Sequence, residues 1–119
     1  MLARSYPYYL ANRAVWANQA LKVHDKYTGE LATEVALADD AAIDAAIAAA
    51  VTAQRELGRM HAYERKAVLV HCATQLTARA EELAEVLCVE AGKPIRDARG
   101  EVERAIDTFT VAAEESTRM

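Results

Sequence analysis

A glycine followed by a lysine, Gly92-Lys93, is the first feature of this 119-residue sequence that could carry chemistry. A loop that binds nucleotide phosphates has the pattern GxxxxGK[ST], in which a second glycine opens the loop and a hydroxyl after the lysine binds Mg²⁺. Here Leu87 stands in the place of the first glycine and Pro94 in the place of the hydroxyl residue. Gly92 and Pro94 are instead typical of a helix end followed directly by a helix start. The sequence therefore predicts a boundary between two helices at residues 92–94 and no phosphate site.

The cysteines and histidines are the other residues with the chemistry of a nucleophile or a metal ligand. A reactive thiolate needs a helix N-terminus or a cationic neighbour, whereas Cys72 falls within an apolar helical stripe and Cys88 near a helix C-terminus, where the dipole disfavours an anion. On one helix their Cα atoms would lie about 24 Å apart, too far for a disulfide. We predict two free thiols that serve packing. His24, His61 and His71 share no spacing typical of a metal site.

Arg104 lies in the middle of a predicted helix that begins near residue 95. At about 100° per residue its side chain points away from the apolar side that contains Val102 and Ile106. Spacing alone favours an ordinary solvent-exposed arginine, paired with Glu101 or Asp107 at three-residue spacing. An arginine can also bind an oxyanion, because its planar set of N–H donors matches that geometry.

Helical periodicity covers most of the sequence after residue 38. Asp39-Asp40 favour a helix start by capping, and Gly58 is the expected stop of that helix. A second helical region spans about 61–90, with a bend or break at 77–79, where two apolar stripes fall out of step. The last helix extends from about 95 towards 116 and carries its apolar side on Ala98, Val102, Ile106, Phe109 and Ala113.

Short strands are predicted before residue 39. Residues 6–16 are aromatic and β-prone, with Asn12-Arg13 as the turn between two strands. Residues 20–25 and 30–38 form a second hairpin, because 31–37 alternate with strand periodicity and Gly29 supplies a positive φ. The predicted fold class is α+β, with a β-hairpin region over 6–38 and a helical region of three or four amphipathic helices over 39–119.

Composition and charge exclude several classes of function. Apolar residues make up 53% of the chain, but much of this fraction is alanine, which buries little area, so we expect the chain to depend on a partner surface. A net charge of −4 and a pI near 5.4 argue against a binder of nucleic acid or anionic membrane. The sequence contains no apolar run of membrane-spanning length and no secretory signal. We therefore expect a cytoplasmic location.

An ordered series of short motifs resembles the N-terminal segment of the NAD(P)-dependent aldehyde dehydrogenase superfamily. The resemblance covers nearly the whole chain and depends on the order and spacing of its parts. These are the aromatic strands ending in Val15-Trp16, then Tyr27-Thr28-Gly29-Glu30, the helix AIDAAIAAAVTAQ, Tyr63-Glu64-Arg65, Arg79-Ala80-Glu81-Glu82-Leu83-Ala84, Glu90-Ala91-Gly92-Lys93-Pro94, and Glu101-Val102 leading to Ala112-Ala113-Glu114-Glu115.

The resemblance implies a mechanism that residues 1–119 do not complete. In this family a cysteine thiolate attacks the aldehyde, a hydride passes to the nicotinamide of NAD or NADP, and a glutamate-activated water hydrolyses the thioester. The resemblance places these groups, and the Rossmann-like cofactor domain, beyond position 119. Cys72 and Cys88 do not match the motif of the nucleophile. The helices present here would pack beside the cofactor domain and form one wall of the aldehyde tunnel.

The resemblance also gives Arg104 a possible role. The stretch 101–105 is similar to the branch that acts on anionic aldehydes: non-phosphorylating glyceraldehyde-3-phosphate, lactaldehyde and phosphonoacetaldehyde dehydrogenases. In that branch an arginine at this position would contact the anionic end of the substrate. The implied partners are the rest of the polypeptide, an aldehyde, and further subunits in a dimer or tetramer. The alternative hypothesis is a stand-alone helical interaction module, or an inactive truncated product, derived from the same family.

Overall fold

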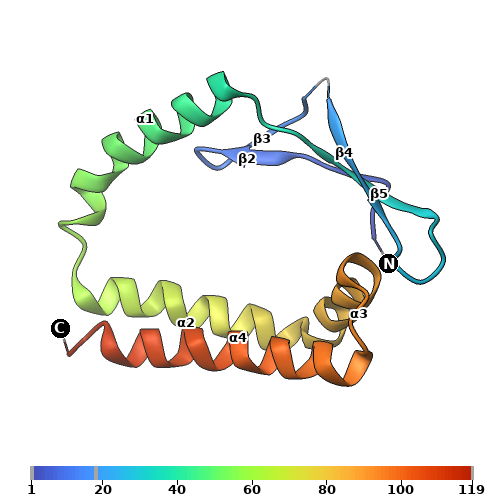
Figure 1. Ribbon diagram of the computed structural model, residues 1–119. Helices are drawn as coiled ribbons and strands as arrows, with labels where there is room; N and C mark the ends of the chain where they lie inside the picture. Colours follow the sequence, from blue (N-terminus) through green and yellow to red (C-terminus); the bar gives the residue numbers. More distant parts are fainter. Residues whose placement is uncertain (1, 18, 119) are drawn as a thin grey trace. The chain divides into compact units, whose positions relative to one another are not determined.

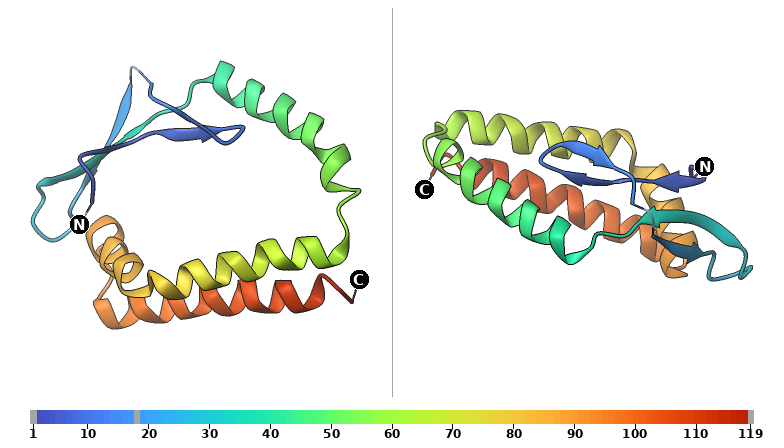
Figure 2. Two further views of the ribbon diagram at one scale, coloured as in Figure 1. Left: turned by 180° about the vertical axis from the view of Figure 1, so that it is seen from behind. Right: turned by 90° about the horizontal axis from the view of Figure 1, so that it is seen from above.

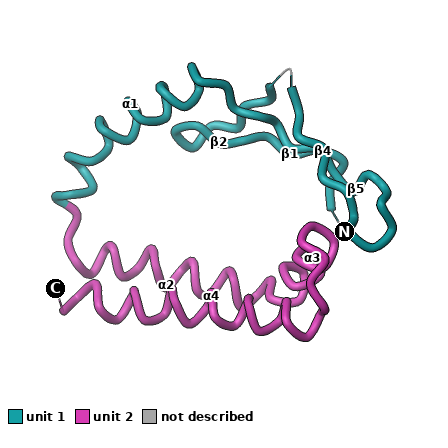
Figure 3. Tube along the Cα trace, in the orientation of Figure 1, with its two compact units in different colours: residues 1–59 teal, residues 60–119 magenta. Residues whose placement is uncertain are grey.

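The computed structural model describes residues 2–17 and 19–118, which divide into two compact units (Figure 3). Unit 1 comprises residues 1–59 and unit 2 comprises residues 60–119. The described elements are short strands followed by helices, which confirms the predicted α+β class. The first helix falls in unit 1 together with the strands, and the other helices form unit 2.

Unit 1 contains two small sheets (Figure 1). Its strands are β1 (Ser5–Tyr6), β2 (Tyr8–Leu10), β3 (Arg13–Val15), β4 (Ala20–His24) and β5 (Leu31–Ala36). In the larger sheet β5 lies in the centre, parallel to β1 and antiparallel to β4, while β2 and β3 form a separate hairpin. The predicted β4–β5 hairpin is confirmed, with Gly29 at φ 75° in its connection. Strand β1 was not predicted, because two residues are too few to show a period.

The turn of the β2–β3 hairpin lies one residue earlier than predicted. It consists of Ala11 and Asn12, at φ 48° and 63°, while Arg13 already belongs to β3 and pairs with Leu10. Two positive φ values are required in the type I′ turn, whose twist matches that of the flanking strands. The prediction of Asn12-Arg13 was wrong because alanine rarely adopts a positive φ, so the sequence gave no signal at position 11.

Helix α1 spans Asp40–Leu57, and the carboxylate of Asp39 accepts a hydrogen bond of 2.8 Å from the Ala42 backbone N–H, as the predicted cap requires. The helix ends before Gly58, as predicted, and this glycine has a right-handed backbone conformation with φ −66°. No residue of α1 is buried, and the apolar residues Ile43 and Ile47 are about half exposed.

Unit 2 consists of α2 (Ala62–Ala78), α3 (Ala80–Ala91) and α4 (Ile95–Glu115). The predicted break in the second helical region is confirmed, since Arg79 separates α2 from α3 with φ −115°. Gly92 ends α3 at φ 68°, and Pro94 directly precedes α4, as predicted for residues 92–94. Helices α2 and α4 lie side by side and run in opposite directions (Figures 1 and 2).

The core of unit 2 is small and made largely of alanine. Ala84 and Ala98 are fully buried where α3 meets α4, next to Val102 at 5% exposure. The larger residues Leu83, Leu87, Cys88 and Ile106 pack around this centre but stay partly exposed. Ala98, Val102 and Ala113 of the predicted apolar side of α4 are buried, whereas Phe109 remains 36% exposed. Alanine contacts bring the helices close together but bury little apolar area.

Two glycines of unit 2 are expected to respond in opposite directions to the same substitution. Gly92→Ala should destabilise the fold by about 1 kcal/mol, because an alanine in the left-handed conformation is strained. Gly100→Ala should stabilise it by about 0.5–1 kcal/mol, since Gly100 lies within α4 and a Cβ there would meet open space. Urea unfolding followed by circular dichroism at 222 nm measures both. Equal effects of the two substitutions would contradict the assigned backbone conformations.

Candidate functional site

The structure places Arg104 on the exposed side of α4, opposite the buried Ala98 and Val102. Its side chain is 72% exposed, and its Nη2 nitrogen donates to a carboxylate oxygen of Glu101, one turn earlier on the helix. This is the three-residue pairing that the sequence predicted. A guanidinium has five N–H donors, and the contact with Glu101 uses one nitrogen. The predicted role of Arg104 in substrate binding stays a prediction.

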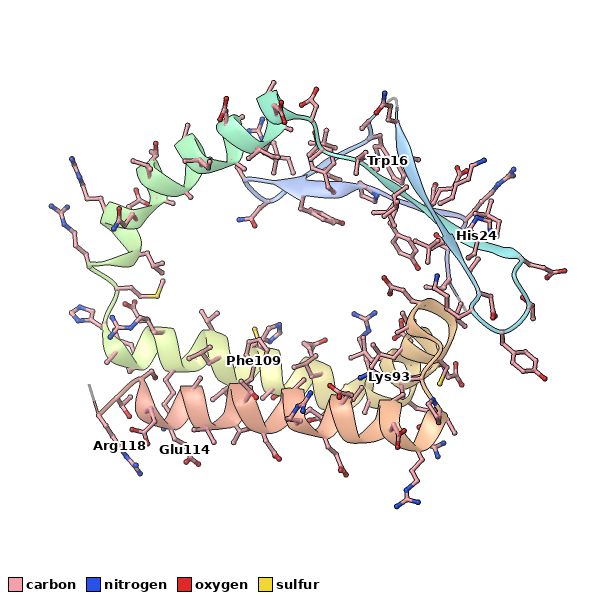
Figure 4. The ribbon with its side chains drawn as sticks, in the orientation of Figure 1. Trp16, His24, Lys93, Phe109, Glu114 and Arg118 are labelled. Atoms are coloured by element: carbon pink, nitrogen blue, oxygen red, sulfur yellow. The ribbon has the colours of Figure 1, made fainter. Side chains whose placement is uncertain are left out.

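Glu101 also contacts a second cation, Lys93, which lies in the connection before α4 (Figure 4). The Lys93 Nζ lies 3.0 Å from Glu101 Oε1, while Arg104 binds Oε2. The hydrogen bond from Lys93, and after it the charge of Arg104, lower the pKa of Glu101. Glu101 therefore remains ionised to lower pH than an ordinary glutamate. One carboxylate is thus shared between two cations.

The lysine of the Gly-Lys-Pro sequence thus has a structural contact that spacing did not reveal. Lys93 and Glu101 are eight residues apart and lie on opposite sides of a helix boundary, so no helical periodicity relates them. The sequence signalled this contact only by a lysine directly after a helix-ending glycine and by a glutamate in the helix that follows. This contact links the connection before α4 to the first turns of that helix.

The cysteines occupy packing positions. Both are free thiols, which confirms the prediction, and both are partly buried. Cys88 packs against the core formed by Ala84, Ala98 and Val102. Cys72 lines a small cavity of about 270 Å³, beside Phe109.

The histidines take part in local contacts. His61 stacks on Tyr63, with ring centroids 5.6 Å apart, and His24 has its Nδ1 atom 3.1 Å from the carbonyl oxygen of Gly29. Within residues 2–17 and 19–118, no three His, Cys, Asp or Glu side chains are placed so that they could hold a metal ion together. In the same residues no helix has both the length and the hydrophobicity needed to cross a membrane.

A groove between α2 and α4 is a further surface feature, which the sequence did not predict. It encloses about 580 Å³ and is lined on α2 by Val70, Ala73 and Thr77, and on α4 by Ile106, Thr110 and Ala113. These residues recur at spacings of three and four along each helix. The threonines concealed the pattern, because they read as polar in a hydrophobicity profile.

Comparisons with known proteins agree on one family. Residues 15–119 match the aldehyde dehydrogenase family. The 3-sulfolactaldehyde dehydrogenase of Priestia aryabhattai is 37% identical over 116 residues, which are 98% of this chain and 24% of the relative. Among solved structures, aldehyde dehydrogenase 21 (ALDH21) from Physcomitrella patens in complex with the reaction product succinate superposes with a TM-score of 0.94 at 49% identity, over 99% of this chain and 25% of that one.

A second solved structure, with lower sequence identity, is also similar to this chain. The glyceraldehyde-3-phosphate dehydrogenase GapN from Methanocaldococcus jannaschii, complexed with NADP, superposes with a TM-score of 0.79 at 32% identity over 82% of this chain and 22% of that chain. The chain thus spans about a quarter of the length of the relatives that it matches, and it matches their N-terminal part. The matched residues, 15–119, include most of unit 1 and all of unit 2. This chain belongs to the aldehyde dehydrogenase family.

Proposed function

We propose that residues 1–119 are the N-terminal segment of an NAD(P)-dependent aldehyde dehydrogenase, which oxidises an aldehyde to a carboxylic acid. The observation that carries the proposal is the superposition on P. patens ALDH21, with a TM-score of 0.94 over 99% of this chain. A stand-alone module of the same family would be free to diverge in fold, whereas this chain keeps the fold of a segment that is a quarter of an enzyme.

In this proposal the chemistry takes place on groups outside residues 1–119. The cysteines lie in packing positions of unit 2. The complete enzyme binds NAD or NADP, supported by the GapN relative complexed with NADP, and this chain alone binds neither. Its contribution is structural, apart from one side chain.

That side chain is Arg104, which we propose binds the anionic end of the substrate. Three relatives are named for, or complexed with, molecules that carry such a group: the sulfonate of 3-sulfolactaldehyde, the carboxylates of succinate and the phosphate of glyceraldehyde-3-phosphate. Arg104 is exposed and shares the carboxylate of Glu101 with Lys93. A guanidinium binds each of these oxyanions through paired N–H donors.

The remaining parts of the proposal concern the assembly and its location. The complete enzyme would form a dimer or tetramer in the cytoplasm. It would act on a small aldehyde and would bind neither nucleic acid nor a membrane. The net charge of −4 supports the absence of a polyanionic partner.

A chimeric enzyme tests the proposed function. Residues 1–119 replace the matched N-terminal segment of P. patens ALDH21, and the formation of NADH or NADPH is measured at 340 nm with succinate semialdehyde. We expect the chimera to reduce the cofactor and the isolated 119-residue chain to give no turnover. A soluble chimera without activity would favour the stand-alone interaction module instead.

A further inference from the structure

Two cations of unit 2 hold different oxygens of the same carboxylate. The Lys93 Nζ lies 3.0 Å from Oε1 of Glu101, and Nη2 of Arg104 donates to Oε2. The side chain of Glu101 is 34% exposed, whereas that of Arg104 is 72% exposed. The carboxylate is therefore the more enclosed member of the pair, and the guanidinium extends from it towards solvent.

The backbone around Lys93 explains how its side chain reaches the helix that follows. Gly92 ends α3 in the left-handed conformation, and Pro94, with φ −55°, directly precedes α4. The Pro94 carbonyl oxygen accepts a hydrogen bond of 2.9 Å from the Asp97 N–H, which starts the first turn of α4. Lys93 thus lies between two constrained backbone positions (Figure 4), and its ammonium group reaches Glu101 two turns further on.

Two other arginines of unit 2 show how a guanidinium binds a carboxylate when both oxygens are available to it. Arg99 binds both oxygens of Glu81, through Nε at 3.0 Å and Nη2 at 2.6 Å. Arg79 binds both oxygens of Glu82 through the same two nitrogens, at 2.8 Å each. In these two bidentate pairs the glutamate takes the parallel N–H donors that a second oxyanion would need.

The pair of Arg104 with Glu101 is different, because it uses Nη2 alone while Lys93 occupies the other oxygen. Of the two cations, Lys93 lowers the pKa of Glu101 more, chiefly through its hydrogen bond. Lys93 therefore competes effectively for this carboxylate. A single contact also joins Arg118 to Glu115, but Arg118 lies beyond the end of α4, so the two pairs are not equivalent.

We infer that Lys93 is a positioning residue for Arg104. By occupying Oε1 of Glu101, it restricts the ion pair on α4 to one contact and leaves the remaining guanidinium donors for the anionic end of the substrate. Without Lys93, both oxygens of Glu101 turn to the guanidinium, as in the two bidentate pairs, and compete with the substrate for its donors. The inference rests on the proposed function of Arg104 in substrate binding.

The substitution Lys93→Met in the chimera tests this role, because it keeps the length of the side chain and removes the ammonium group. We expect the KM for succinate semialdehyde to rise about five- to tenfold, since Glu101 takes donors from the guanidinium. The KM for propanal should stay within about twofold. Lys93→Arg keeps a cation on Oε1 and should leave the KM for succinate semialdehyde near that of the unmodified chimera. Steady-state rates at 340 nm give these constants.

Two double variants of equal net charge separate this contact from the simple loss of a positive charge. Lys93→Met/Glu101→Gln also removes the competing carboxylate and should return the KM for succinate semialdehyde to within about threefold of that of the unmodified chimera. Lys93→Met/Asp107→Asn removes instead an exposed carboxylate three residues after Arg104, which is not the one that binds this arginine. Its KM should remain as high as that of Lys93→Met.

Three results would overturn the inference. Equal recovery in both double variants would mean that Lys93 acts through its charge alone. No recovery in either would mean that Lys93 binds the anionic end itself. A rise of the KM for both aldehydes in Lys93→Met would assign this lysine a structural role.

Arg104→Ala separates the inference from the proposed function on which it rests. If Arg104→Ala raises the KM for succinate semialdehyde and Lys93→Met does not, the inference is wrong and the proposed role of Arg104 remains. If Arg104→Ala leaves this KM unchanged, the proposed role of Arg104 fails, and the inference fails with it.

Discussion

Arg104→Ala in the chimera is expected to raise the KM for succinate semialdehyde roughly 10- to 100-fold, the loss of one charge-assisted hydrogen-bonded pair. The KM for a neutral aldehyde such as propanal should stay within about twofold, because no anionic end is present to be bound. The physical reason is that Arg104 is exposed on α4 and shares Glu101 with Lys93, so it can exchange part of this contact for a ligand. Steady-state rates at 340 nm give both constants.

Arg96→Ala is the matched control for this prediction. Arg96 is an exposed arginine of the same helix, two turns before Arg104, so its loss removes the same charge from α4. We expect its KM values for both aldehydes to stay near those of the unmodified chimera. An equal rise of the KM for both aldehydes in Arg104→Ala would assign Arg104 a purely structural role.

Ala98→Asp is expected to be the most damaging single change in unit 2. Ala98 packs against Ala84 and Val102 and is fully buried, with 0% of its surface accessible to water. A carboxylate at this position would be buried without a partner and should cost about 3–5 kcal/mol. Position 98 lies in the first turns of α4, where the helix dipole favours an acid, so the dipole opposes the expected loss.

Ala112→Asp makes the same exchange at an exposed position of the same helix. It should cost only about 1 kcal/mol, from lower helix propensity and an unfavourable helix terminus. Thermal unfolding followed by circular dichroism at 222 nm compares the two variants. Similar midpoints would mean that the contact between α3 and α4 contributes little to the stability of unit 2.

The helices could be predicted because their signals are local. Asp39 caps α1 and Gly92 ends α3 through contacts within a few residues, and the break at Arg79 follows from the phase of two neighbouring stripes. Features that depend on residues distant in sequence could not be predicted. The parallel pairing of β1 with β5 joins Ser5 to Glu34, and no pattern within a two-residue strand records it.

The same distinction between local and distant contacts applies to the candidate site. The exposure of Arg104 and its pairing with Glu101 followed from helical spacing. The contact of Lys93 with Glu101 crosses a helix boundary and was not predicted. The α2–α4 groove was missed for a chemical reason, since a threonine whose hydroxyl is bonded to its own helix behaves as an apolar residue. Hydrophobicity scales assign it the polar value of a free hydroxyl.

The rate of cofactor reduction by a Cys72→Ala/Cys88→Ala double variant of the chimera tests most directly whether the reactive groups lie outside residues 1–119. Both thiols are packing residues of unit 2, so the account predicts a kcat within about twofold of that of the unmodified chimera, with at most a modest fall in thermal midpoint. Removal of a nucleophile costs several orders of magnitude in kcat. A loss of that size in a folded double variant would contradict the account.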